Sequence, residues 1–221
     1  MEGRIDPEKV RAKFGGDYIA DRILYIMGID VRFSGRIASR FAGKTVLETC
    51  SGGGFSTIAL AREAKHVYAV DIDPYHQQAA RGNVEKAGLT DKVTFIRGDA
   101  LDEQLLETAT GEGLVRADVR IEAAFLDPDW AVTGEDHVYR FRDSNTRPPA
   151  DRLLERVMEI TPNVALILPP LTDRAELEGL PPHEFQMLYM NDGLELYVLY
   201  FGDLMEVEGE TEEHVRDETD G

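Results

Sequence analysis

The chain has 221 residues, of which 43% are hydrophobic and 30% are charged, a composition that suits a globular domain. No apolar run approaches the roughly 20 residues of a membrane span, and the polar N-terminus lacks the pattern of a secretory signal, so a cytoplasmic protein without membrane contact is expected. The formal net charge of -18 argues against binding to extended DNA or RNA, because so acidic a protein repels a phosphate backbone.

Three segments follow one another along the chain. Residues 1–29 are expected to form a helical N-terminal segment and a candidate lid, because their apolar residues recur at helical spacing. Residues 30–205 are expected to form one α/β domain. Residues 206–221 contain eight acids and a single base, Arg216, so this tail is expected to be solvated and disordered.

Short apolar runs alternate with helical patterns through the middle of the chain. Between the second and third runs, Asp73 is expected to cap a helix that Pro74 opens and Gly88 ends. The alternation predicts a parallel sheet with helices on its faces. The runs are rich in β-branched or aromatic residues, as buried strands should be, and they span residues 45–48, 67–71, 93–97, 121–126 and 163–168.

The C-terminal part of the domain shows a different pattern. The runs EFQMLYM and LELYVLYF flank Asn191, Asp192 and Gly193, which is a strong hairpin signal. The last two strands are therefore expected to be antiparallel to each other. Together these elements predict an α/β, Rossmann-like fold with a seven-stranded mixed sheet and a C-terminal antiparallel hairpin, which is the usual plan of class I methyltransferases.

Polar and glycine-rich motifs follow the first three runs. The segment ETCSGGGFST places Gly52 and Gly54 in a turn where a ligand can approach backbone N–H groups at a helix N-terminus. Asp71 ends the second run about 20 residues further on, where an acid accepts the hydroxyls of a ribose. Asp99 follows the third run and could accept an adenine amino group, although alone it would more often be a cap. The expected site for S-adenosylmethionine comprises Glu48, Cys50, Gly52, Gly54, Asp71, Ile72, Asp99, Ala100 and Asp127.

The fourth run ends in the tetrad Asp127-Pro128-Asp129-Trp130. Methyltransferases that act on exocyclic amines carry a D/N/S-P-P-aromatic motif at this place. A polar side chain and a proline carbonyl there accept hydrogen bonds from the amine, and the aromatic ring stacks on the base. The structural alternative makes Trp130 a core anchor and the aspartates turn formers.

Four blocks of the sequence resemble the trimethylguanosine synthases, which are RNA cap guanine-N2 methyltransferases. The resemblance covers about Asp30 to Leu204 and runs in order through VLETCSGGGFSTIAL, VYAVDIDPYHQQAARGNVEKAGLTDKVTFIRGDAL, AAFLDPDW and YFGDL. It implies methyl transfer from S-adenosylmethionine to an exocyclic amine of a guanine nucleotide or capped RNA, with Asp127 and Pro128 positioning the amine and Trp130 stacking on the base. This family has a second proline where the present chain has Asp129. That departure would loosen the turn, and its acid would suit a cationic base such as 7-methylguanine.

The segment after the tetrad, residues 131–149, is long for a connection. Its Arg140, Arg142 and Arg147 form a basic cluster in an acidic chain. Arg140 and Arg142 are expected to contact substrate, because arginines suit a short polyphosphate, and a merely solvated role is the alternative. Cys50 has no partner for a disulfide, and the five histidines show no metal-ligand spacing, so no metal site is expected.

Three other functions remain open from the sequence. A methyltransferase could act on a small metabolite, and the altered tetrad leaves room for a non-catalytic protein that binds the cofactor or a partner. A nicotinamide enzyme ranks below both, because Thr57 stands where the nicotinamide fingerprint has its third glycine.

Overall fold

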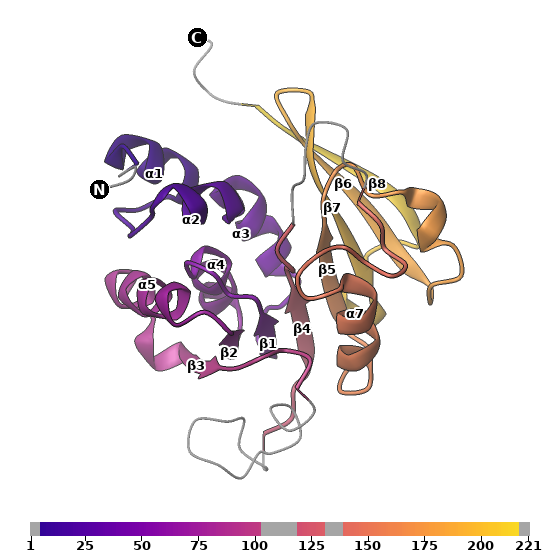
Figure 1. Cartoon of the computed structure of the whole chain (residues 1–221), viewed down its shortest axis with the longest axis horizontal. Helices are drawn as coiled ribbons and strands as arrows, with labels where there is room; N and C mark the ends of the chain where they lie inside the picture. The colour runs from indigo at the N-terminus through magenta and orange to yellow at the C-terminus, as the bar shows by residue number, and fades with distance from the viewer. Residues whose placement is uncertain (1–4, 103–118, 131–138, 217–221) are drawn as a thin grey trace. The chain divides into compact units, whose positions relative to one another are not determined.

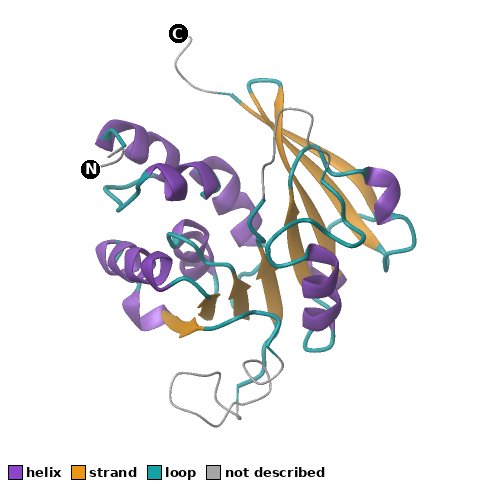
Figure 2. Ribbon diagram, in the orientation of Figure 1, coloured by secondary structure: helices purple, strands orange, loops and turns teal. Residues whose placement is uncertain are grey.

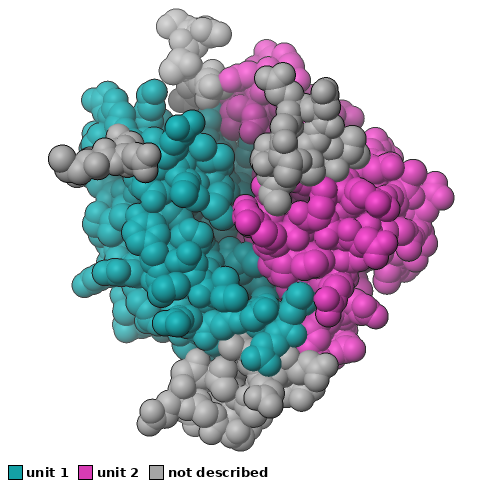
Figure 3. All heavy atoms as spheres, in the orientation of Figure 1, with its two compact units in different colours: residues 1–123 teal, residues 124–221 magenta. Residues whose placement is uncertain are grey.

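The structure is a computed structural model that describes residues 5–102, 119–130 and 139–216. The chain divides into two compact units, Met1–Ala123 and Ala124–Gly221, which Figure 3 colours separately. This division falls inside the segment 30–205, and the domain boundaries stay a prediction. No helix in the described ranges is both long enough and apolar enough to cross a membrane.

The three strands of the first unit are parallel and adjacent in the order β3-β2-β1 (Figure 1). They are β1 (Thr45–Thr49), β2 (His66–Asp71) and β3 (Val93–Arg97). All of β1 and all but the first residue of β2 are buried, as expected for strands covered on both faces. Because the strands are parallel, the residues that follow Thr49, Asp71 and Arg97 share one edge of this sheet. The first three predicted strands are confirmed.

Helices α4 (Phe55–Glu63) and α5 (Pro74–Lys86) follow β1 and β2, and the short η1 (Thr90–Lys92) precedes β3 (Figure 2). The Asp73 carboxylate accepts hydrogen bonds from the backbone N–H groups of Tyr75 and His76 at 2.7 and 3.3 Å. Gly88 follows the helix in the left-handed conformation. The predicted cap, the proline start and the glycine end of this helix are therefore confirmed.

The N-terminal segment, residues 1–29, contains α1 (Pro7–Phe14) and α2 (Arg22–Met27), and α3 (Val31–Ser39) follows it. The rings of Phe14 and Phe55 stack with centroids 3.6 Å apart, which fastens α1 to α4. A Cβ on Gly28 would lie 2.6 Å from Phe55 and 2.7 Å from Phe14, so glycine is needed where the chain passes these rings between α2 and α3. Residues 7–14 and 22–27 of the segment are helical, whereas its boundary and its role as a lid stay predictions.

The second unit has five strands in the order β4-β5-β7-β6-β8. They are β4 (Ala123–Leu126), β5 (Val164–Leu168), β6 (His183–Met190), β7 (Gly193–Phe201) and β8 (Gly209–Val215), with helices α7 (Ala150–Met158), η2 (Arg174–Leu177) and η3 (Gly202–Leu204). Strands β4 and β5 are parallel, whereas β7 is antiparallel to β5 and β6. Asn191 and Asp192 both have positive φ, as the tight turn of the predicted hairpin requires.

The acidic tail differs from what its sequence predicts. Residues 209–215 form β8, which pairs in parallel with β6 and brings the described strands to eight where seven were expected. Glu184 of β6 holds the tail, because its carboxylate accepts hydrogen bonds from Thr211 Oγ1 and the Glu206 N–H, both at 2.9 Å. The prediction of a solvated tail was based on its many acidic residues. That composition does not indicate whether an exposed strand edge elsewhere in the chain can form backbone hydrogen bonds with the tail. Residues 217–221 lie outside the described part of the chain.

Candidate functional site

The turn between β1 and α4 is built for close approach of the backbone. Cys50, Gly52 and Gly54 all have positive φ, at 60, 50 and 80°. A Cβ on Gly54 would lie 2.9 Å from the Cα of Ala80 on α5, so this glycine is required by both conformation and space. A Cβ on Gly52 would meet only the Cys50 carbonyl oxygen at 3.9 Å. The space beside the Gly52 Cα is therefore open to a ligand.

We expect Gly54→Ala to lower the free energy of unfolding by about 2–3 kcal/mol, because it adds a clash to left-handed strain. Gly88→Ala is the matched control, since Gly88 has a similar φ of 70° and a Cβ added there would meet no atom within 4 Å. Strain alone should cost that control about 1 kcal/mol. Urea unfolding of the two variants measures the difference, and equal losses would contradict the close packing of the turn on α5.

Asp71 is held in place by the backbone of the glycine turn and of its own strand end. Its side chain is buried, and its two oxygens accept hydrogen bonds from the backbone N–H groups of Gly52 and Asp73, both at 2.8 Å. Each carboxylate oxygen can still accept a further bond. The predicted turn and the predicted acid are therefore brought together, and they present a fixed pair of acceptors of the kind that a ribose diol needs.

The other predicted cofactor residues of this unit differ in exposure. Ile72 is 65% exposed directly after Asp71, whereas Glu48 in β1 and Ala100 are buried. Asp99 is exposed, and its carboxylate accepts a hydrogen bond from the Leu101 N–H at 2.9 Å. The bond is local to a turn, and together with the exposure of the side chain it fits the surface role that the sequence left open as an alternative. Within the described ranges, no three His, Cys, Asp or Glu side chains are grouped to hold a metal ion.

Two residues near this turn were missed from the sequence. Asn83 of α5 is fully buried, and its side-chain amide bonds the backbone of Ile19 in both directions, at 2.6 and 3.0 Å, and the Gly53 carbonyl at 2.8 Å. It thereby ties the N-terminal segment to the glycine turn. His76 has Nδ1 3.7 Å from Asp71 Oδ1, and this carboxylate raises the pKa of His76 against the opposing effect of burial. Neither residue belongs to a pattern that sequence alone reveals.

In the second unit, the tetrad follows β4. Burial raises the pKa of Asp127 to about 7, and the neighbouring charge of Asp129 adds to the shift. Pro128 is buried, and Trp130 is partly buried, with an indole N–H that has no hydrogen-bond partner among the described residues. The tetrad thus combines a carboxyl group poised between two protonation states with an indole donor.

Asp129 is joined to Arg147 by three contacts. The Asp129 N–H donates to the Arg147 carbonyl at 2.8 Å, and the Arg147 N–H donates to the Asp129 carbonyl at 2.9 Å. An ion pair of 2.6 Å joins Arg147 Nη2 and Asp129 Oδ2. The charge of Asp129 is therefore offset within the protein, which argues against its attracting a cationic base.

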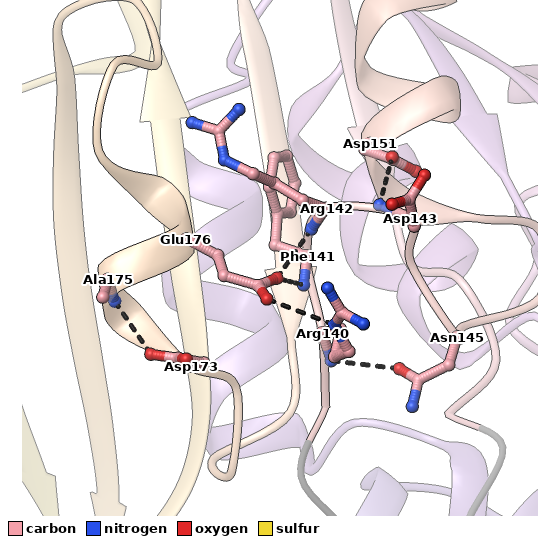
Figure 4. Close-up of polar contacts among 9 residues, drawn as sticks. All are labelled: Arg140, Phe141, Arg142, Asp143, Asn145, Asp151, Asp173, Ala175 and Glu176. Carbon is pink, nitrogen blue, oxygen red and sulfur yellow. Dashed lines mark hydrogen bonds and ion pairs between the residues drawn. The ribbon is translucent and has the colours of Figure 1, made fainter.

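Arg140 and Arg142 lie on the segment that faces η2 (Figure 4). The carboxylate of Glu176 accepts hydrogen bonds from Arg140 Nε at 3.2 Å and from the backbone N–H groups of Phe141 and Arg142 at 2.7 and 2.8 Å. Arg142 Nη2 donates to the Glu178 carbonyl at 2.5 Å. These contacts hold the segment in place, and substrate contact by the two arginines stays a prediction. Residues 131–138 of the same predicted loop lie outside the described part of the chain.

Comparison with known proteins places these motifs in context. A family model described as RNA cap guanine-N2 methyltransferase matches residues 43–202, more than two thirds of the chain. Catechol O-methyltransferase of Mycobacterium tuberculosis is 39% identical over 103 residues, which cover 43% of this chain and 45% of that protein. The chain thus spans less than half the length of this relative.

Two solved structures share the fold. A putative methyltransferase from Porphyromonas gingivalis W83 superimposes with a TM-score of 0.69 and 21% identity, covering 91% of this chain and 48% of that one. The O-methyltransferase TomG from Streptomyces achromogenes, solved in complex with S-adenosylmethionine, superimposes with a TM-score of 0.57 and 14% identity, covering 91% and 92%. The predicted fold class is confirmed.

Proposed function

The chain belongs to the RNA cap guanine-N2 methyltransferase family of class I methyltransferases, and from this premise we propose that it transfers a methyl group from S-adenosylmethionine to an exocyclic amine of a guanine nucleotide or RNA end. The observation that carries this proposal is the family match across residues 43–202, which includes the glycine turn, Asp71 and the tetrad. When bound, S-adenosylmethionine supplies an electrophilic methyl group.

The first unit fits the adenosine part of this cofactor. The open space beside the Gly52 Cα allows close approach, and Asp71 offers two oriented acceptors for the ribose hydroxyls. The Ser51 hydroxyl is buried at the turn without a hydrogen-bond partner among the described residues, so it is available to a polar ligand group. The exposed side chain of Ile72 suits the apolar face of an adenine ring.

The second unit supplies the groups for the acceptor. The ionised Asp127 carboxylate and the Pro128 carbonyl would accept hydrogen bonds from the amine and fix the direction of its lone pair. The Trp130 ring would stack on the base, and its indole N–H would donate to the base or its sugar. Positioning is the main contribution asked of these residues, because the methyl group is already electrophilic.

A small-molecule oxygen acceptor is the second candidate. The Mycobacterium tuberculosis relative is a catechol O-methyltransferase and is 39% identical to this chain over 103 residues. The engagement of Arg140 and Arg142 with Glu176 and Glu178 also supports an acceptor without a polyphosphate, because these arginines are already bonded within the protein.

Calorimetric titration with S-adenosylmethionine, followed by assay of S-adenosylhomocysteine release, tests both candidates. Binding of the cofactor and turnover with 7-methylguanosine triphosphate are the expected results. Turnover with catechol alone would favour the second candidate. Cofactor binding without turnover on either acceptor would favour a non-catalytic protein, and absence of cofactor binding would overturn the proposal.

A further inference from the structure

The contact between Asp129 and Arg147 joins positions 18 residues apart through backbone and side chain together. The two backbone hydrogen bonds form an isolated antiparallel bridge outside the named strands. Such a bridge needs an N–H at position 129, which proline lacks. The tetrad is therefore bonded to a residue outside its own turn, Arg147, which the sequence marks only as a member of a basic cluster.

We propose that Arg147 is a positioning residue for the acceptor motif, which it holds through Asp129 while offsetting the negative charge beside Asp127. This inference rests on the proposed function, because it concerns the same acceptor residues. The bridge and the ion pair together form the Asp129–Arg147 clamp.

The ion pair and the backbone bridge of the clamp are expected to contribute differently to stability. The side chains of Arg147 and Asp129 are 72% and 31% exposed, and an ion pair this exposed to solvent contributes little net stability to the fold. The two backbone bonds use no side-chain atom, so they are expected to remain when the side chains are replaced. Loss of the guanidinium should therefore remove one of the three contacts on Asp129 and leave its charge unpaired, while the fold stays intact.

The charge of Asp129 matters because it affects the pKa values of neighbouring side chains. Its carboxylate raises the pKa of Asp127 and adds to the effect of burial on Tyr139, whose pKa is also raised. Arg147 is the cation paired with that carboxylate. Removing Arg147 leaves the Asp129 charge uncompensated, which should raise the pKa of Asp127 further and favour its protonated form at neutral pH.

Trp130 provides a direct probe, since it is the only tryptophan and adjoins Asp129. In Arg147→Gln we expect shifted Trp130 emission and faster acrylamide quenching, measured without any acceptor. We also expect kcat to fall about tenfold while cofactor affinity stays unchanged, because a loosened acceptor is held less often in a reactive geometry. The pH at half-maximal rate should move upward.

Two further variants complete the experiment. The charge-swapped double variant Asp129→Arg with Arg147→Asp should recover much of the emission and rate, because it rebuilds the pair in reverse. Arg152→Gln is the matched control, an exposed arginine on α7 in the same unit. Circular dichroism melting checks that each variant is folded.

The outcomes distinguish this inference from the proposed function. If Trp130 emission, quenching and pH profile in Arg147→Gln matched those of Arg152→Gln, the positioning role would be overturned. Failure to find any methyl acceptor would overturn the proposed function, whereas the emission and quenching measurements would still decide whether Arg147 holds the tetrad.

Discussion

Asp71→Ala is expected to weaken S-adenosylmethionine binding by about 100-fold. The variant removes the two acceptor oxygens that Gly52 and Asp73 orient, and hydrogen bonds to a charged group contribute about 1.5–3 kcal/mol each. Loss of two such bonds to a ribose diol corresponds to at least two factors of ten in the dissociation constant. Isothermal titration calorimetry with S-adenosylmethionine and S-adenosylhomocysteine measures the change.

Asp73→Ala is the matched control for this effect. Asp73 caps α5 through its carboxylate, and only its backbone N–H contacts Asp71, so the alanine variant keeps that contact. Loss of the cap should cost about 1 kcal/mol of stability and change cofactor affinity only slightly. If both variants weakened binding equally, the effect would reflect damage to α5, and Asp71 would not be a specific ribose acceptor.

The strands of the first unit were predictable because their apolar runs are short and their ends carry turn residues. Residues 67–71 and Asp73-Pro74 mark a strand end and a helix start within a few successive positions, and the structure places both there. The hairpin was predictable for the same reason, since Asn191 and Asp192 tolerate positive φ. Local chemistry determines these elements, so local patterns revealed them.

Strand β8 was not predictable from such patterns. Its sequence is mostly acidic, and its ordering depends on the edge of β6 and on Glu184, which accepts bonds from Thr211 and from the Glu206 backbone. Those partners come from a strand more than twenty residues earlier. The same holds for the break between α2 and α3, which follows from the proximity of Gly28 to Phe14 and Phe55.

The candidate site likewise contains some residues that local sequence patterns revealed and others that they did not. Asp71 was identified from its place at a strand end, and the structure gives it two oriented backbone donors. The contacts of Asn83 with Ile19 and of Arg147 with Asp129 cross 64 and 18 residues, and neither spacing carries a recognisable signal. Sequence therefore indicated where a ligand group could be held, whereas the residues that hold the site itself required the structure.

The second large effect is expected at Asp127, which should control methyl transfer through its protonation state. Its pKa is raised to about 7, so the carboxyl is neutral below that pH and becomes a full acceptor for an amine above it. The wild-type rate of transfer should rise as pH increases through about 7. Asp127→Ala should reduce transfer by about 100-fold at pH 8, because no side-chain acceptor remains. Initial rates of S-adenosylhomocysteine release between pH 5.5 and 9 would give both results.

Asp127→Asn separates the hydrogen bond from the ionisation. The amide oxygen accepts at every pH, so this variant should keep measurable transfer but lose the rise in rate as pH increases through about 7.

The pH dependence of stability gives a second test of Asp127 that needs no methyl acceptor. The pKa of Asp127 in the folded protein, about 7, lies above its ordinary value of 3.8. Between these two pH values the folded protein therefore holds a proton that the unfolded chain has released. The free energy of unfolding should consequently fall as pH rises from about 4 to about 7. The fall should be smaller in Asp127→Asn, as measured by urea unfolding at pH 5 and pH 8. A wild-type rate that is flat across pH 7, together with a pH dependence of stability equal to that of the variant, would show that Asp127 is ionised throughout and is not the group that switches the acceptor site.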